Sequence, residues 1–215
     1  MARVRLALAL GLGCLALFAP SAHAATASVV IGYYPDPTGD GCSRYMMCEY
    51  RNVVVVAGAG EANALTVTAT ADGITIRDAG APLSAGTGCT AAPDGVICPL
   101  HGVRVRAGDG NDSVSVSGSV GAEVRGGPGG DVLTGGAGWD HLLGGGGADR
   151  LDGGAGSDLL RGGAGTDQIL GRSGPDRIYA RDGDPDRVHG GRGRDRARVD
   201  ANLDVVRSAR RTIAP

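Results

Sequence analysis

The feature that most constrains this chain is a nine-residue period that runs without a break from residue 126 to residue 179. Six consecutive nine-residue words fill this stretch: GGPGGDVLT, GGAGWDHLL, GGGGADRLD, GGAGSDLLR, GGAGTDQIL and GRSGPDRIY. A helix would place positions nine apart about half a turn out of register, and its glycines would cost roughly 1 kcal/mol each relative to alanine. The period therefore excludes a helix and indicates a repeat architecture.

The eighth position of each word predicts the core. It is always Leu or Ile, flanked by mostly polar residues, at Leu133, Leu142, Leu151, Leu160, Ile169 and Ile178. This is a minimal period-two pattern, so the last three residues of each word are expected to form a short strand whose middle side chain points inward. The first six residues are expected to form a turn, because glycine supplies the positive φ angles that a tight turn requires.

The sixth position of each word predicts a metal site. It is always aspartate, at Asp131, Asp140, Asp149, Asp158, Asp167 and Asp176. If the turns stack at the ~4.8 Å spacing of adjacent strands, neighbouring carboxylates repel by ~3.5 kcal/mol at an effective dielectric constant of about 20. Calcium suits such a column, because it binds six to eight carboxylate and carbonyl oxygens at roughly 2.3 to 2.6 Å. Ca²⁺ is therefore the expected cofactor.

These words match the pattern G-G-x-G-x-D-x-U-x, and through it the chain resembles the repeats-in-toxin (RTX, hemolysin-type) calcium-binding family. The resemblance implies an all-β fold in which two words form one coil of a right-handed parallel β-roll, with calcium between the loops of successive coils. It places Asp131, Asp149 and Asp167 on one side of the roll and the other three aspartates on the opposite side. About four well-formed sites follow from this arrangement.

The period continues less regularly on both sides of the six words. Residues 107–115 form a good word with Asp112, which could stack over Asp131, whereas residues 116–125 lack the sixth-position aspartate. After Tyr179, Asp186 and Asp195 occupy the diagnostic position, although Pro185 and several arginines depart from the family pattern. The predicted roll therefore spans residues 107–198, and Asp112, Asp186 and Asp195 join the candidate metal ligands.

The last segment, residues 199–215, is predicted to be a basic cap or tail. Its apolar residues are expected to cover the last coil: Val199, Leu203, Val205 and Val206. The alternative is a basic patch that recognises an anionic component of the cell envelope.

The first 24 residues resemble a secretory signal peptide, with a cationic start, an apolar run and a small-x-small cleavage site ending at Ala24. A lipoprotein signal through Cys14 is the alternative.

Cleavage leaves an even number of cysteines, which in an exported chain favours disulfides over free thiols or a zinc site. Three pairings are open, and nearest-neighbour pairing is the prediction: Cys42 with Cys48 and Cys89 with Cys98.

Residues 25–106 are rich in short β-branched stretches but contain no clear nine-residue word. They are interpreted as a degenerate start of the same solenoid or as a small β cap held by disulfides, and a separate ligand-binding domain is the third alternative. The degenerate-repeat interpretation rests on pairs one word apart, such as Val67 with Ile76 and Val105 with Val114. A cap is expected because the end of a solenoid exposes apolar surface and unpaired strand edges.

The composition and the absence of catalytic motifs limit the classes of function that this chain can have. Aromatic residues make up 3% of the chain, so the roll lacks the large side chains of an ordinary core and is expected to need its metal to fold. No H-E-x-x-H or G-x-S-x-G motif is present, and the G-x-G-x-x-G matches follow from the repeat itself. The prediction is a secreted, non-enzymatic calcium-binding protein without nucleic-acid binding or membrane insertion. The alternative is a cell-surface adhesion or envelope-scaffold module that uses the roll as a spacer.

Overall fold

The described part of the chain consists of β-strands joined by turns and loops. The computed structural model describes residues 26–33, 49–56, 62–70, 73–79, 83–85, 89–93, 95–98 and 102–212. The predicted signal peptide and the predicted Cys42–Cys48 pair lie outside these residues. All regular elements within them are strands, which confirms the all-β class. Among the same residues there is no helix with the length and apolarity needed to cross a membrane.

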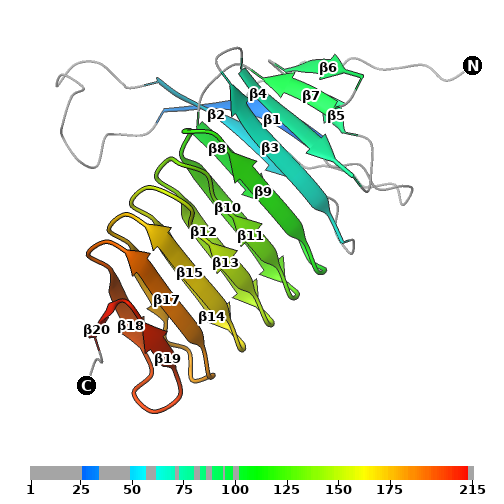
Figure 1. The fold of residues 1–215 in the computed structure, drawn as a ribbon. Coiled ribbons are helices and arrows are strands. Elements are labelled where there is room, and N and C mark those ends of the chain that lie inside the picture. Colours follow the sequence, from blue (N-terminus) through cyan, green and yellow to red (C-terminus); the bar gives the residue numbers. More distant parts are fainter. Residues whose placement is uncertain are drawn as a thin grey trace, which may run out of the picture.

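The strands form two sheets of ten strands each (Figure 1). Sheet A contains β1 (Thr26–Tyr33), β2 (Glu49–Val56), β5 (Ser84–Ala85), β8 (Gly102–Arg106), β10 (Ala122–Pro128), β12 (His141–Gly146), β14 (Leu159–Ala164), β16 (Arg177–Ala180), β18 (Arg196–Val199) and β20 (Arg210–Thr212). Sheet B contains β3 (Ala64–Thr70), β4 (Gly73–Asp78), β6 (Thr90–Ala92), β7 (Gly95–Cys98), β9 (Ser113–Ser117), β11 (Val132–Thr134), β13 (Arg150–Asp152), β15 (Gln168–Ser173), β17 (Arg187–Arg192) and β19 (Val205–Arg207).

From β8 onward the chain alternates between the two sheets, and every pairing is parallel. Leu133 in β11 pairs with Leu151 in β13, which pairs with Ile169 in β15. Each step is 18 residues, so two nine-residue words make one coil. The coils stack along one axis in Figure 1, and the predicted parallel β-solenoid is confirmed.

The core lies between the two sheets, and in the repeat segment its large side chains are those of the eighth position. All six predicted residues are at most 1% exposed, and Ala197 fills the same position near the C-terminal end. Each side chain stacks on its counterpart in the next coil, because parallel in-register pairing places equal word positions side by side. The prediction that the eighth position forms the core is confirmed.

The division of each word into strand and turn was only partly correct. In β12, β14, β15 and β17 the strand continues into the first three positions of the following word. The first-position glycines in these strands, such as Gly144 and Gly162, are buried. A six-residue turn was predicted because glycine destabilises strands. In the structure, hydrogen bonds between successive coils keep these glycines in the strand. Gly126 in β10, for example, accepts the Gly108 N–H of the preceding coil at 3.1 Å.

The N-terminal strands form an antiparallel cap on the parallel stack. β2 and β3 pair in parallel with β8 and β9, but β1 pairs antiparallel with β2, and β3 with β4. Val67 and Ile76 are opposite each other in the β3–β4 hairpin, so interpreting their spacing as a repeat was wrong. The cap strands belong to the same two sheets as the roll.

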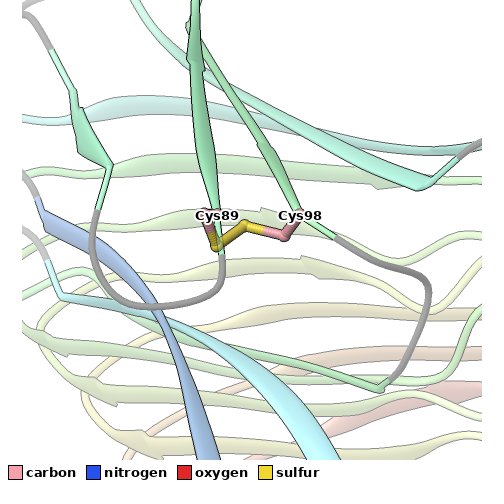
Figure 2. The surroundings of a disulfide bond; sticks show 2 residues. All are labelled: Cys89 and Cys98. Carbon is pink, nitrogen blue, oxygen red and sulfur yellow. A yellow bond between two sulfur atoms is a disulfide. The ribbon is translucent and has the colours of Figure 1, made fainter.

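A disulfide holds the outer part of this cap. Cys89 precedes β6 and bonds to Cys98 at the end of β7, with a Cα–Cα distance of 4.4 Å (Figure 2). This confirms the one predicted pair that falls within the described residues. Closing a loop of this length contributes on the order of 2 to 3 kcal/mol to stability in the chain-entropy model.

The C-terminal strands continue both sheets beyond residue 198. β19 pairs with β17 and β20 pairs with β18, both in parallel. Val199 is buried and Val206 packs against the core, but Leu203 and Val205 are 46% and 54% exposed. The prediction that all four apolar residues cover the last coil is therefore wrong for Leu203, which lies in a turn, and for Val205, which points outward from its strand.

Candidate metal centre: two columns of buried aspartates

All nine predicted aspartates are buried, with at most 4% of their surface exposed. They are Asp112, Asp131, Asp140, Asp149, Asp158, Asp167, Asp176, Asp186 and Asp195. Asp204, also buried, extends the set and was missed in the sequence. Its signal was present, because Asp204 follows Asp186 by one 18-residue coil and precedes Val206 by the usual two positions. Isolated carboxylates are rarely buried without a partner, so such a set calls for an explanation.

The aspartates form two columns, one along each edge of the roll. In each column the backbone N–H of one aspartate donates to Oδ1 of the aspartate one coil later. Five such bonds of 2.7–3.0 Å link column one, which contains Asp112, Asp131, Asp149, Asp167, Asp186 and Asp204. Three bonds of 2.9–3.0 Å link column two, which contains Asp140, Asp158, Asp176 and Asp195. The structure thus brings the predicted residues together in the predicted two groups.

The second carboxylate oxygen, Oδ2, is buried without a hydrogen-bond donor in most of these aspartates. In eight of these aspartates Oδ2 is buried and has no hydrogen-bond partner among the described residues: Asp112, Asp131, Asp149, Asp158, Asp167, Asp176, Asp186 and Asp195. The two remaining members differ, because Asp140 Oδ2 accepts the Gly136 N–H at 2.8 Å and Asp204 Oδ2 accepts the Asp200 N–H at 2.6 Å. A buried oxygen without a donor costs about 1 to 3 kcal/mol, and more when it is charged. A regular series of such oxygens fits a cation as their common ligand.

The first-position glycines leave space around these oxygens. A Cβ on Gly144 would collide with Asp149 Oδ2 and would stand 2.6 Å from the carbonyl oxygen of Gly162 in the next coil. Gly153 is placed in the same way, with Asp158 Oδ2 at 2.6 Å and the Gly171 carbonyl at 3.0 Å from the position of its absent Cβ. A carboxylate oxygen from one coil and a carbonyl oxygen from the next therefore converge on one space. Calcium prefers this mixed oxygen donor set.

Burial also changes the acidity of these groups. It raises the pKa of Asp149, Asp158 and Asp186 to about 7, and that of Asp167 and Asp176 to about 6. Neighbouring carboxylates in the same column act in the same direction but less strongly, whereas the backbone N–H bonds oppose the shift. Without a cation the columns therefore resist ionisation near neutral pH. A divalent cation between the coils would reverse this and favour the carboxylate form.

Neither column has a carboxylate in the coil before its first aspartate. Asn63 takes that place above Asp112, and donates both its backbone N–H and its Nδ2–H to Asp112 Oδ1 at 2.7 and 2.9 Å. In column two, Ala122 occupies the corresponding place one coil before Asp140 and donates its N–H to Asp140 Oδ1 at 2.8 Å. Carboxylates therefore stack in pairs only from Asp112 onward in column one and from Asp140 onward in column two.

Comparison with known proteins agrees with this geometry. Residues 125–160, 143–178 and 161–197 match the family described as the RTX calcium-binding nonapeptide repeat (4 copies). No curated protein and no solved structure matches the chain. The segment from residue 125 to residue 197 therefore consists of RTX calcium-binding nonapeptide repeats, folded as a parallel β-solenoid with stacked aspartates.

Proposed function

We propose that this chain is an exported protein whose roll folds and is stabilised when calcium occupies the two aspartate columns. The observation that carries the proposal is the series of eight buried Oδ2 atoms without donors, six of which lie beside a first-position glycine. The residues that would hold calcium are the aspartates of both columns, together with backbone carbonyls of the glycine-rich loops. The bound ion supplies positive charge between coils that otherwise repel.

The proposed role of calcium is structural, and no catalytic step is part of it. Folding a small-side-chain roll orders many residues while burying few large side chains, so ion binding is expected to supply much of the free energy of folding. Calcium sites of modest affinity fill at the millimolar concentrations found outside cells. Export is supported by the signal-like first 24 residues and by the Cys89–Cys98 disulfide, which is typical of oxidising compartments.

Circular dichroism during a calcium titration tests this proposal. The mature chain is expected to show little β signal in chelator and a cooperative gain with calcium, whereas magnesium is much less effective because it requires a smaller octahedral shell. Replacing Asp149 and Asp158 together with Ala should weaken calcium affinity and folding in parallel. A chain that is equally folded in chelator and in calcium would contradict the structural role.

A second candidate function is adhesion to an anionic cell-envelope polymer. The loops along column two border a hollow of about 470 Å³ that is lined by the 59%-exposed Trp139 and by Arg177, Arg194 and Arg196. Guanidinium groups bind anionic groups through several donors, and an exposed indole can stack on a sugar ring. Pull-down of envelope fragments compares the wild type with the Arg194→Ala, Arg196→Ala double variant. Arg150→Ala on sheet B is the control, and equal capture by all three proteins would contradict this function.

A further inference from the structure

The loop between β16 and β17 differs from the other loops of the roll. Its word, residues 180–189, has ten residues instead of nine and contains Asp182, Asp184 and Asp186. Asp182 occupies the third position, where the six regular words have uncharged residues: Pro128, Ala137, Gly146, Ala155, Ala164 and Ser173. The first position, usually glycine, is Ala180. This loop therefore combines an extra carboxylate with the loss of the first-position glycine.

The extra carboxylate lies against the column. Asp167, Asp182 and Asp186 each offer an oxygen, and these three oxygens lie within 4.8 Å of one another. Asp167 and Asp186 are each 1% exposed, and their Oδ2 atoms have no hydrogen-bond partner among the described residues. Asp182 is exposed, so the cluster is open to solvent on one side. Two buried carboxylates, each with one oxygen that has no donor, and a third carboxylate at the surface thus point to a common ligand.

Hydrogen bonds hold the loop in this conformation without an ion. Asp182 Oδ1 accepts the Asp184 N–H at 2.9 Å, and Asp184 Oδ2 accepts the Gly165 N–H of the preceding coil at 3.0 Å. Asp200 Oδ2, from the following coil, accepts the N–H groups of Asp182 and Gly183 at 3.1 and 2.9 Å. The loop is therefore fixed from both sides, and the site is largely formed before binding, which reduces the entropic cost of binding.

The local charge is strongly negative. The carboxylate of Asp182 acts on both Asp167 and Asp186, where it adds to burial in raising their pKa. Arg181, in the same loop, pairs with Asp200, with its Nε 3.9 Å from Asp200 Oδ1. Calcium affinity rises with the number of charged ligands and with the rigidity of the site. Both conditions favour this layer over the two-carboxylate layers of the regular words.

We infer that Asp167, Asp182 and Asp186 form a three-carboxylate calcium site that binds more tightly than the other layers of the roll and fills first. This inference rests on the proposed calcium function. It assigns to Asp182 a ligand role that the nine-residue pattern does not include. Ion binding therefore begins near the C-terminal end of the roll, and the regular layers fill at higher calcium concentration.

Isothermal titration of the mature chain with calcium tests the inference through Asp182→Asn. Asparagine keeps the oxygen that accepts the Asp184 N–H but removes the charge. The wild type is expected to show one tight class of site and a weaker class, and the variant to lose roughly tenfold to a hundredfold in affinity at the tight class only. Asp182→Ser, which is also uncharged, should behave in the same way.

Asp109→Asn is the matched control. Asp109 also stands in the third position of a word that begins with alanine, but Asn63 replaces the carboxylate of the preceding coil there. This variant should leave the tight class unchanged, and circular dichroism at saturating calcium should show the same roll in all variants. If calcium binds but Asp182→Asn retains the tight class, or if Asp109→Asn removes it equally, the three-carboxylate site is wrong while the calcium function stands. If the wild type binds no calcium, the proposed function itself fails.

Discussion

Replacing one column aspartate with asparagine should have opposite effects with and without calcium. Asp149 is the best position, because it is 3% exposed, lies in the middle of column one, and has a pKa raised by burial to about 7 from 3.8. Each pKa unit corresponds to 1.36 kcal/mol, so ionising this carboxylate in the calcium-free roll at pH 8 costs about 4 kcal/mol relative to the unfolded chain. Asparagine avoids this cost and retains an oxygen for the Asp131 N–H.

The pH dependence follows from the same difference. The folded pKa lies above the unfolded one, so the calcium-free roll is most stable below about pH 3.8 and loses stability as the pH rises towards 7. The advantage of Asp149→Asn in chelator should therefore shrink from about 4 kcal/mol at pH 8 to roughly 1.5 kcal/mol at pH 5. In saturating calcium the order reverses, because the variant loses a charged ligand and binds the ion roughly tenfold to a hundredfold more weakly.

The assay must report folding without calcium. An osmolyte such as TMAO favours compact states, so circular dichroism can follow folding in chelator as its concentration rises. Asp149→Asn should fold at a lower TMAO concentration than the wild type, yet unfold at a lower denaturant concentration in calcium. Asp152→Asn is the control, since Asp152 lies outside the columns and pairs with Arg172 at 2.6 Å on the surface; it should change stability by less than about 1 kcal/mol in both conditions. A variant less stable than the wild type in chelator would refute the reasoning.

Four further predictions concern other parts of the roll. Gly144→Ala should lower calcium affinity and cost about 1 to 3 kcal/mol by overpacking, whereas Gly146→Ala, where an added Cβ meets nothing within 4 Å, should be nearly neutral in the same titration. In chelator, the wild-type β signal should increase as the pH falls from 8 to 5, because the buried carboxylates take up protons; an unchanged spectrum would contradict the raised pKa values. Arg172 has a φ of 75°, so Arg172→Gly should be about 1 kcal/mol more stable than Arg172→Ala in denaturant titrations, since both lose the ion pair but only glycine relieves the strain. Replacing Cys89 and Cys98 with Ser should cost on the order of 2 to 3 kcal/mol, measured by denaturation, and should leave calcium stoichiometry unchanged.

Much of the repeat segment could be predicted from one period. Leu151 in the core and Asp149 at the edge follow from the same nine-residue spacing, because parallel in-register stacking turns equal word positions into columns. The role of Gly144 could not be predicted in this way. Gly144 is required because the Asp149 side chain and the Gly162 carbonyl of the next coil occupy the space that a Cβ would need. These contacts exist only once the coils are stacked.

The ends of the chain were less predictable for a different reason. The antiparallel hairpin of Val67 and Ile76 has no repeat to reveal it, and its nine-residue separation imitates the period by chance. Asp204 was missed because the nine residues around it, 199–207, contain no glycine and so do not match the repeat, although the spacing from Asp195 and Asp186 is regular. Leu203 is apolar but sits in a turn of the chain, where hydropathy alone predicted a covering role.

The hydrogen bonds along each column have a direction. The backbone N–H of Asp131 donates to the carboxylate of Asp149, 18 residues later, and the N–H of Asp149 donates to the carboxylate of Asp167. The ribosome makes the chain from its N-terminus. The hydrogen bond of each aspartate N–H can therefore form only after the next coil has been synthesised and folded. Growth of the ordered roll should run backwards, from late residues towards early ones, against the order in which the ribosome makes them.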